Sequence, residues 1–209
     1  MADWTTIASL STAGGTLVLA VATFSSVRAS QRSARIAEQS LLVGLRPVLA
    51  PARENDPPMT VSFIDRQLVT VTRGMAAIER HGDSLYFVLP LRNVGAGIAV
   101  LHSWAIWPLE ERPEASDPSH YRRQTRDLYI PAGELGFWQA AIREPQDEMR
   151  AGIDAAYDER TPLALDLLYG DHEGGQRVVS RFSLIPNDDG GWLPGVARHW
   201  RLDGVNPRD

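Results

Sequence analysis

A run of uncharged residues near the start of the chain limits what it can fold into more than any other feature. From Trp4 to Val27 there are 24 residues with no Asp, Glu, Arg or Lys: thirteen are apolar, two are glycine and nine are Ser or Thr. A helix rises about 1.5 Å per residue, so this run is long enough for the roughly 30 Å hydrocarbon core of a bilayer. Ser and Thr are tolerated there because their hydroxyls bond back to a carbonyl one turn earlier. We therefore expect residues 1–27 to form a transmembrane helix; a buried helix of a soluble domain is the alternative.

The charges that flank this run predict its orientation. Asp3 precedes it, whereas Arg28, Arg32 and Arg35 follow it, which is the reverse of the order in a cleaved signal peptide. Arginines close to a span are held on the cytoplasmic side, so we expect the N-terminus outside and the C-terminal domain in the cytoplasm. The opposite orientation would make the rest of the chain an extracytoplasmic binding domain. The three arginines share one helix face and could also meet lipid phosphates, although fixing the topology is the simpler role.

The helical pattern continues beyond the apolar run. Gln31 to Leu45 contains no proline and many helix formers, and Gly44 with Arg46-Pro47 supplies a stop signal. We expect a juxtamembrane helix over residues 28–45.

A stripe of small hydroxyl residues follows this helix at a 3.5-residue period. Nine of eleven stripe positions are Ser or Thr; the positions are Thr5, Ser9, Thr12, Thr16, Leu19, Thr23, Ser26, Ser30, Ser33, Ala37 and Ser40. This period keeps one seam facing a partner helix, and small residues allow close approach in lipid. Thr12, Thr16, Thr23 and Ser26 are the candidate interface residues. Chance composition explains the stripe equally well. A helix lying flat on the membrane fits worse, because its polar face would carry Arg or Lys.

Composition excludes several kinds of chemistry in the remaining residues, 46–209. The chain has no cysteine and no lysine, since all 21 basic residues are arginine. These absences exclude disulfides, thiolate nucleophiles, Cys-ligated metals, a Walker-type phosphate loop and Schiff-base mechanisms. The net charge of −5 argues against nucleic acid as a partner, because such binders need a basic face.

Residues 46–209 predict a mainly β domain. Short apolar runs alternate with Gly, Pro, Asn and Asp, a pattern typical of an antiparallel β-sandwich, and about 160 residues suffice for a core. The expected strands are Val48–Ala50, Thr60–Phe63, Leu68–Val71, Leu85–Arg92, Ile98–Trp107, Leu128–Ile130, Leu135–Ile142, Leu163–Tyr169 and Arg177–Ile185. One short inserted helix is expected at Gln146–Tyr157, where apolar residues recur at spacings of four and three.

Turn residues predict how these strands connect. We expect a hairpin over Leu85–Trp107, turned by Asn93-Val94-Gly95-Ala96-Gly97, and a second over Leu163–Ile185, turned at residues 171–175. Glu110–His120, acidic and rich in proline, is expected to be a mobile loop.

Two segments resemble a known group of proteins. They are Leu91–Val100, a strand followed by N-x-G-x-G and another strand, and Leu168-Tyr169-Gly170-Asp171 followed by Gly174-Gly175 and a strand containing Phe182. They are similar to segments of uncharacterised bacterial single-pass membrane proteins. Those proteins have an N-terminal transmembrane helix, a juxtamembrane helix ending in Arg-Pro and a C-terminal immunoglobulin-like domain. The resemblance implies an immunoglobulin-like β-sandwich here and brings no catalytic residue with it.

Few side chains outside the helix indicate chemistry. The five histidines show no metal-ligand spacing, and the G-x-S-x-G and H-E-x-x-H motifs are absent. His172, between Asp171 and Glu173, could bind a cation or transfer a proton, but a solvated turn is the simpler interpretation. A basic and aromatic cluster of Tyr121, Arg122, Arg123 and Arg126 could hold an acidic partner, a phosphate or a membrane surface.

The function that these features favour is a membrane-anchored, non-enzymatic interaction or scaffold module without a cofactor or metal. Its partners would be the lipid bilayer and, through the helix, a second copy or another membrane protein. The alternative from a different class is a hydrolase-like enzyme whose Ser, His and carboxylate groups are brought together only by the fold.

Overall fold

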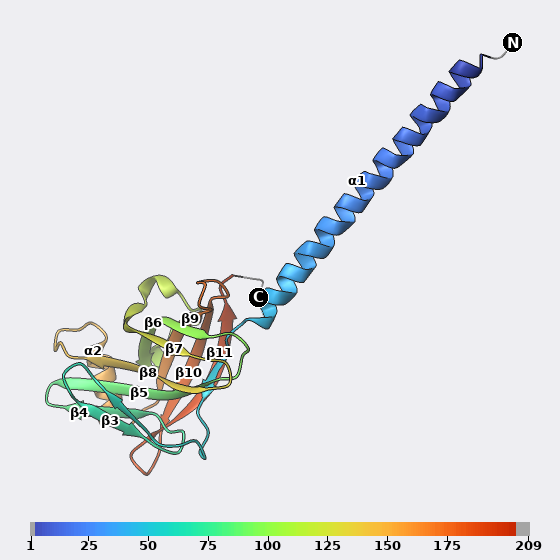
Figure 1. Cartoon of the computed structure of the whole chain (residues 1–209). Helices are drawn as coiled ribbons and strands as arrows, with labels where there is room; N and C mark the ends of the chain where they lie inside the picture. The colour runs from blue at the N-terminus through green and yellow to red at the C-terminus, as the bar shows by residue number, and fades with distance from the viewer. Residues whose placement is uncertain (1–2, 204–209) are drawn as a thin grey trace. The chain divides into compact units, whose positions relative to one another are not determined.

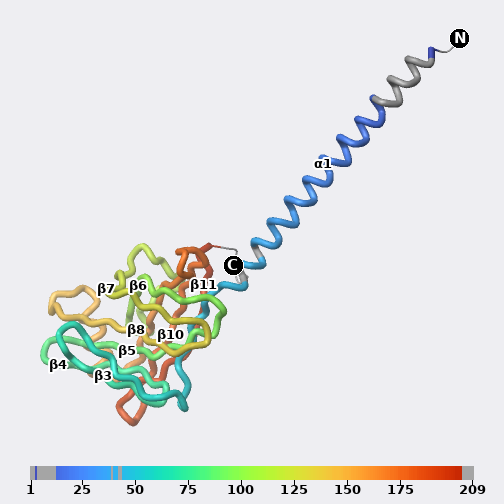
Figure 2. Tube along the Cα trace, in the orientation of Figure 1, coloured from blue at the N-terminus to red at the C-terminus, as the bar shows by residue number. Residues whose placement is uncertain are grey.

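The structure is a computed structural model that describes residues 3–203 (Figures 1 and 2). Within the helix, the side chains of residues 4–12, 39, 42 and 43 lie outside the description. The chain divides into two compact units, residues 1–44 and 45–209.

The first unit contains one continuous helix, α1 (Trp4–Gly44), of 41 residues. The expected continuation of the helix beyond residue 27 is therefore confirmed, with no break between the two predicted segments. The helix ends at Gly44, next to the stop signal that the sequence indicated. Pro47 could not continue it, because a prolyl ring clashes with the preceding turn and lacks an N–H.

One layer of the second unit is a four-stranded antiparallel sheet. Its strands are β1 (Leu49–Pro51), β4 (Ala77–His81), β5 (Ser84–Asn93) and β8 (Leu135–Ile142). The central strand is β5: β8 pairs along one side, while β4 and β1 divide the other side between them. The sheet therefore depends on β5, which is buried along nearly its whole length.

The other layer is a five-stranded antiparallel sheet in the order β11-β10-β9-β6-β7. Its strands are β6 (Ala99–Pro108), β7 (Arg122–Ile130), β9 (Leu163–Gly170), β10 (Val178–Pro186) and β11 (Trp192–Arg201). The predicted hairpin over Leu163–Ile185 is confirmed: β9 and β10 pair from Tyr169 opposite Val178 to Leu163 opposite Leu184.

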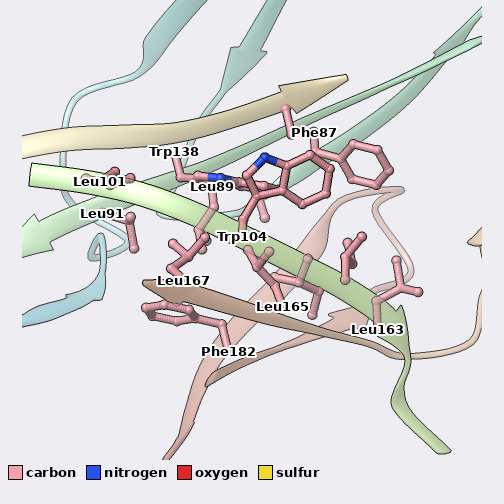
Figure 3. Close-up of a cluster of buried hydrophobic side chains, with 14 of the residues drawn as sticks. Phe87, Leu89, Leu91, Leu101, Trp104, Trp138, Leu163, Leu165, Leu167 and Phe182 are labelled. Atoms are coloured by element: carbon pink, nitrogen blue, oxygen red, sulfur yellow. The ribbon is translucent and has the colours of Figure 1, made fainter. Parts of the chain in front are cut away.

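The core lies between the two sheets, where alternate side chains of each strand point inward (Figure 3). Trp104 of β6 and Trp138 of β8 meet edge to face, with ring centroids 5.4 Å apart. Such contacts add to the burial of each large apolar side chain, which itself contributes about 1.5–3 kcal/mol. Further inward residues are Phe87, Leu89, Leu91, Leu101, Leu163, Leu165, Leu167 and Phe182. The domain is thus mainly β, as its alternating pattern predicted.

Smaller elements cover the outside of this core. The hairpin of β2 (Met59–Ser62) and β3 (Leu68–Val71) packs on the outer face of β5, against Tyr86 and Val88. The helix α2 (Arg150–Asp158) buries its apolar face in the main core. It begins later than predicted because Asp147 starts a turn, accepting a hydrogen bond from Met149 N at 3.1 Å. Two short 3-10 helices, Leu109–Glu111 and Pro118–His120, lie between β6 and β7.

The predicted hairpin over Leu85–Trp107 is wrong. The strands β5 and β6 flank the turn, but β5 belongs to the four-stranded sheet and β6 to the five-stranded one. The five residues after Asn93 therefore carry the chain from one layer to the other. Turn composition identifies where the chain changes direction, but both sheets need an apolar strand here, so the pattern cannot distinguish hairpin pairing from a crossover.

Candidate functional site

Large apolar side chains of α1 point outward on several sides of the helix. Leu17, Val18, Leu19, Val21 and Phe24 are between 62% and 69% exposed. At about 100° per residue they are spread around the helix rather than along one stripe, so no single face could bury all of them. In the described part of the chain, no helix has both the length and the apolarity for a membrane crossing.

The hydroxyl stripe lies on the same helix. Thr23 donates from Oγ1 to Leu19 O at 2.8 Å, the local bond that makes hydroxyls tolerable in an apolar helix. Thr16 and Ser26 are exposed, and the side chain of Thr12 lies outside the description. With the Thr23 hydroxyl already satisfied, this position would serve a partner helix by its small size rather than by a new hydrogen bond.

The three arginines after the apolar run are exposed. Arg28, Arg32 and Arg35 make no ion pair with any residue whose side chain the structure describes. Spacings of four and three place them along one side of α1. Their charges are therefore available to an external anionic group.

The N-x-G-x-G segment holds the chain where it enters the second unit. Asn93 is fully buried, and its Oδ1 accepts hydrogen bonds from Val48 N at 3.2 Å and Gly95 N at 3.0 Å. Its Nδ2 donates to Gly97 O at 2.6 Å and Ile130 O at 2.9 Å. One amide thus joins the crossover, the end of β7 and the residues that precede β1.

The two glycines of this segment allow close contact with the same residues. A Cβ on Gly97 would lie 1.6 Å from Leu45 O, and one on Gly95 would lie 2.4 Å from Arg46 O. The Arg46 guanidinium in turn donates to Gln176 Oε1, at 3.0 Å from Nη2. We call Asn93, Gly95, Gly97, Arg46 and Gln176 the linker clamp. The glycine spacing serves this contact, and no helix follows it to bind a pyrophosphate.

A buried ion pair lies on the outer face of the five-stranded sheet. Arg181 of β10 binds Asp166 of β9 through two hydrogen bonds, Nε to Oδ1 at 2.6 Å and Nη2 to Oδ2 at 2.8 Å. Tyr121 donates to Asp166 Oδ2 at 2.7 Å. The ring of Trp200 covers the Arg181 guanidinium, with its centroid 4.9 Å from Cζ. Burial, the largest cause, raises the pKa of Tyr121 far above its usual value, so the phenol stays a donor.

The same pair anchors the loop that the sequence predicted to be mobile. Arg181 Nη1 donates to Pro113 O at 2.7 Å, and Ser116 bonds the Tyr121 hydroxyl. The loop therefore covers the ion pair, which explains how a charged pair is tolerated on a buried sheet face. Its proline and acidic content predicted a mobile loop. The structure places two short 3-10 helices at its ends, and a buried arginine binds its backbone, which the composition did not indicate.

The structure does not bring Tyr121, Arg122, Arg123 and Arg126 to one surface. Tyr121 is buried beside Asp166, whereas Arg122 pairs with Asp147. Burial, the largest single cause, acts to raise the pKa of Asp147. The hydrogen bonds from Arg122 and from Met149 N, together with the charges of Arg122 and Arg150, nevertheless hold that pKa below its usual value. Arg123 is exposed, and Arg126 donates to Ser62 O at 3.2 Å.

The Ser and His groups required by the enzyme alternative meet at one place in the described residues. Ser180 Oγ lies 2.6 Å from His199 Nδ1. Ser180, however, is fully buried on the inner face of β10, and its hydroxyl also contacts Tyr169 Oη at 2.8 Å. A nucleophile needs access to its substrate as well as a neighbouring base. Ser180 has no such access, although His199 reaches the surface. The pair belongs to a hydrogen-bond network in which Tyr169 Oη also accepts from Leu49 N.

The acidic turn around His172 is a structural turn. Asp171 Oδ1 accepts hydrogen bonds from Glu173 N at 3.1 Å and Gly175 N at 2.8 Å, while His172 points to solvent. Across residues with described side chains, no group of three or more His, Asp or Glu could hold a metal ion.

The sequence patterns singled out neither Asp166 nor Arg181, and they assigned Asn93 only to a turn. Asp166 and Arg181 each interrupt a strongly apolar strand and Asn93 ends one, which is the signal that could have found their roles. No protein-family model matches this chain, and no curated protein matches it either.

Proposed function

We propose that this protein is a single-pass, membrane-anchored interaction module without catalytic activity, with its N-terminus outside and residues 45–209 in the cytoplasm. The observation that carries the proposal is the distribution of exposed apolar side chains all around α1, in a unit whose described residues form this single helix. Apolar surface on every side of a helix is stable when lipid or protein surrounds the helix.

The lipid environment is favoured over a protein one by the length and the flanks of the run. The uncharged run begins at Trp4, nine residues before the first helix side chain that the structure describes, Ala13. Arg28, Arg32 and Arg35 then supply positive charge where lipid phosphates of the cytoplasmic leaflet would lie.

The linker clamp fixes the first residues of the second unit. The main chain of Leu45 lies against Gly97 and that of Arg46 against Gly95, while Arg46 Nη2 donates to Gln176 Oε1 at 3.0 Å. The domain is therefore folded from its first residues onward, as an interaction module requires. An immunoglobulin-like sandwich belongs to the same proposal, supported by two packed antiparallel sheets with a crossover between them and by the resemblance to bacterial single-pass proteins.

Membrane extraction tests the anchoring directly. The full chain and residues 45–209 are expressed separately, and their membrane fractions are washed with alkaline carbonate. We expect the full chain to stay in the pellet until detergent is added, and the shorter chain to stay in the supernatant. Release of the full chain by carbonate alone would overturn the proposal.

A further inference from the structure

A groove of about 470 Å³ opens on the second unit, between the tip of the β2–β3 hairpin and strands β7 and β8. Its lining residues are Ser62, Phe63, Ile64, Thr125, Arg126, Gln139, Ala140, Ala141 and Arg143. Its volume lies within the range of about 300–1,000 Å³ typical of ligand sites. Most of the lining surface is apolar, and Ile64 at its edge is 90% exposed, which leaves its side chain open to contact with an apolar ligand group.

One polar side chain in this lining lacks a partner. Gln139 is only 5% exposed, and its Oε1 has no hydrogen-bond partner in the part of the chain that the structure describes. A buried polar atom left unsatisfied costs about 1–3 kcal/mol. Gln139 stands among apolar neighbours of β8, where leucine would avoid this cost, so the amide indicates a ligand that completes its hydrogen bonds.

A positive charge lies at the same groove. Arg126 donates to Ser62 O but pairs with no carboxylate among the residues that are described. Arg143, also in the lining, is neutralised by Asp65, its Nε being 2.9 Å from Oδ2. The groove therefore combines an apolar floor, an unsatisfied amide and one uncompensated guanidinium.

We propose that this groove binds the C-terminal end of a partner polypeptide whose last residue is apolar. The apolar side chain covers Phe63 and Ala141, the peptide backbone pairs with the Gln139 amide, and the terminal carboxylate meets Arg126. Capture of a chain terminus by a small polar site is a recurrent mode of peptide recognition. The inference deepens the proposed function, on which it rests, by naming what the interaction module binds.

The amide favours a peptide over a lipid. Each peptide unit carries both an N–H donor and a C=O acceptor, so it satisfies the Gln139 side chain in either orientation of the amide. A fatty acyl chain offers neither group, and its carboxylate accepts hydrogen bonds but donates none, so it could not satisfy Gln139 Oε1. A fatty acid would thus leave the cost of the buried amide in place.

Fluorescence anisotropy with the detergent-solubilised full chain tests the proposal. The probe is a fluorescein-labelled octapeptide of Gly and Ser that ends in two leucines with a free carboxylate. We expect saturable binding, weakened about tenfold or more when the carboxylate is amidated, because a charge-assisted bond is lost. A probe ending in two serines should bind much more weakly than the leucine probe.

Three variants locate the binding. Arg126→Gln should weaken binding of the free carboxylate to the level of the amidated peptide, and should leave the amidated peptide unaffected. Gln139→Leu should weaken both peptides. It removes an unsatisfied buried group, so thermal melting should show a fold at least as stable as the parent. Arg123→Gln, on the same strand but outside the lining, is the matched control and should change neither affinity.

Binding that survives both Arg126→Gln and Gln139→Leu would overturn the proposal, as would no binding of the leucine probe. Displacement of the probe by oleate as strongly as by the unlabelled peptide would assign the groove to a lipid instead. The assay needs no vesicles. A failure to bind the peptide is therefore distinguishable from a failure of membrane anchoring, which the carbonate wash measures.

Discussion

Arg181 and Asp166 lie in the middle of strands whose other inward and outward positions are largely apolar. Their two hydrogen bonds, the Tyr121 hydroxyl and the Pro113 carbonyl leave neither charge unsatisfied. At the scale of single residues, this network fixes the position of the loop over the outer face of the five-stranded sheet.

Replacement of Arg181 by methionine should destabilise the domain strongly. It leaves Asp166 buried without its partner, a change that costs about 3–5 kcal/mol. Urea unfolding of residues 45–209 measures this loss of unfolding free energy. Arg177→Met, which removes the exposed pair with Asp203, is the matched control and should cost less than about 1 kcal/mol. Equal and small losses of unfolding free energy in both variants would contradict the view that the Arg181–Asp166 pair is buried and needs both partners.

His199 should make the stability of the domain depend on pH. Part of its side chain reaches solvent, but burial of the rest lowers its pKa below 6.5. The unfolded chain then binds a proton more readily than the folded one, so the contribution of His199 is complete above about pH 6.5 and is lost as the pH falls through the lowered folded pKa.

His199→Asn should therefore flatten the fall in unfolding free energy between about pH 7 and pH 5. Asn retains an atom able to bond Ser180 Oγ without titrating. His120→Asn, at an exposed position on a short 3-10 helix, is the control. A pH profile that is identical in parent and His199→Asn would show that the buried part of the ring plays no part.

Among the elements, those with strong local patterns were predictable. The strand β3 and the strand β8 have the predicted bounds, and α1 ends at the predicted glycine. The sequence missed β4 and β11. Ala77–His81 carries three polar residues, and Trp192–Arg201 contains proline and glycine. Both owe their pairing to a long neighbouring strand, β5 or β10, and such tertiary support leaves no mark on the local pattern.

Among the candidate sites, too, only local features could be predicted from the sequence. Periodicity predicted the hydroxyl stripe and charge order predicted the flanking arginines, and both are local features of one helix. The linker clamp and the groove join residues separated by up to 130 positions, as Arg46 and Gln176 are, and no spacing rule brings them together.

The hydroxyl stripe leads to a prediction about α1. If Thr16 and Thr23 face a second helix, Thr16→Leu with Thr23→Leu should weaken self-association of residues 1–45 in a membrane. Small-residue interfaces contribute roughly 1–2 kcal/mol per contact, so the double variant should shift association by about tenfold. Val18→Leu with Ala22→Leu, off the stripe, should have less effect. Equal crosslinking in both double variants would make the stripe an accident of composition.

At the scale of the whole molecule, the chain divides into the helix α1 and a domain with its own core. Residues 45–209 contain the whole two-sheet core and should fold alone. We expect circular dichroism of this fragment to show mainly β structure and a cooperative thermal transition. A spectrum dominated by helix, or unfolding without cooperativity, would contradict this division.

The orientation of the full chain in the membrane tests the central claim most directly. Alkaline phosphatase and green fluorescent protein are fused separately to the C-terminus, because the first is active only outside the cytoplasm and the second fluoresces only inside it. The proposed topology predicts a fluorescent cell with inactive phosphatase, since arginines that follow an apolar span, here Arg28, Arg32 and Arg35, would keep the domain inside. Active phosphatase with a dark fluorescent fusion would contradict it.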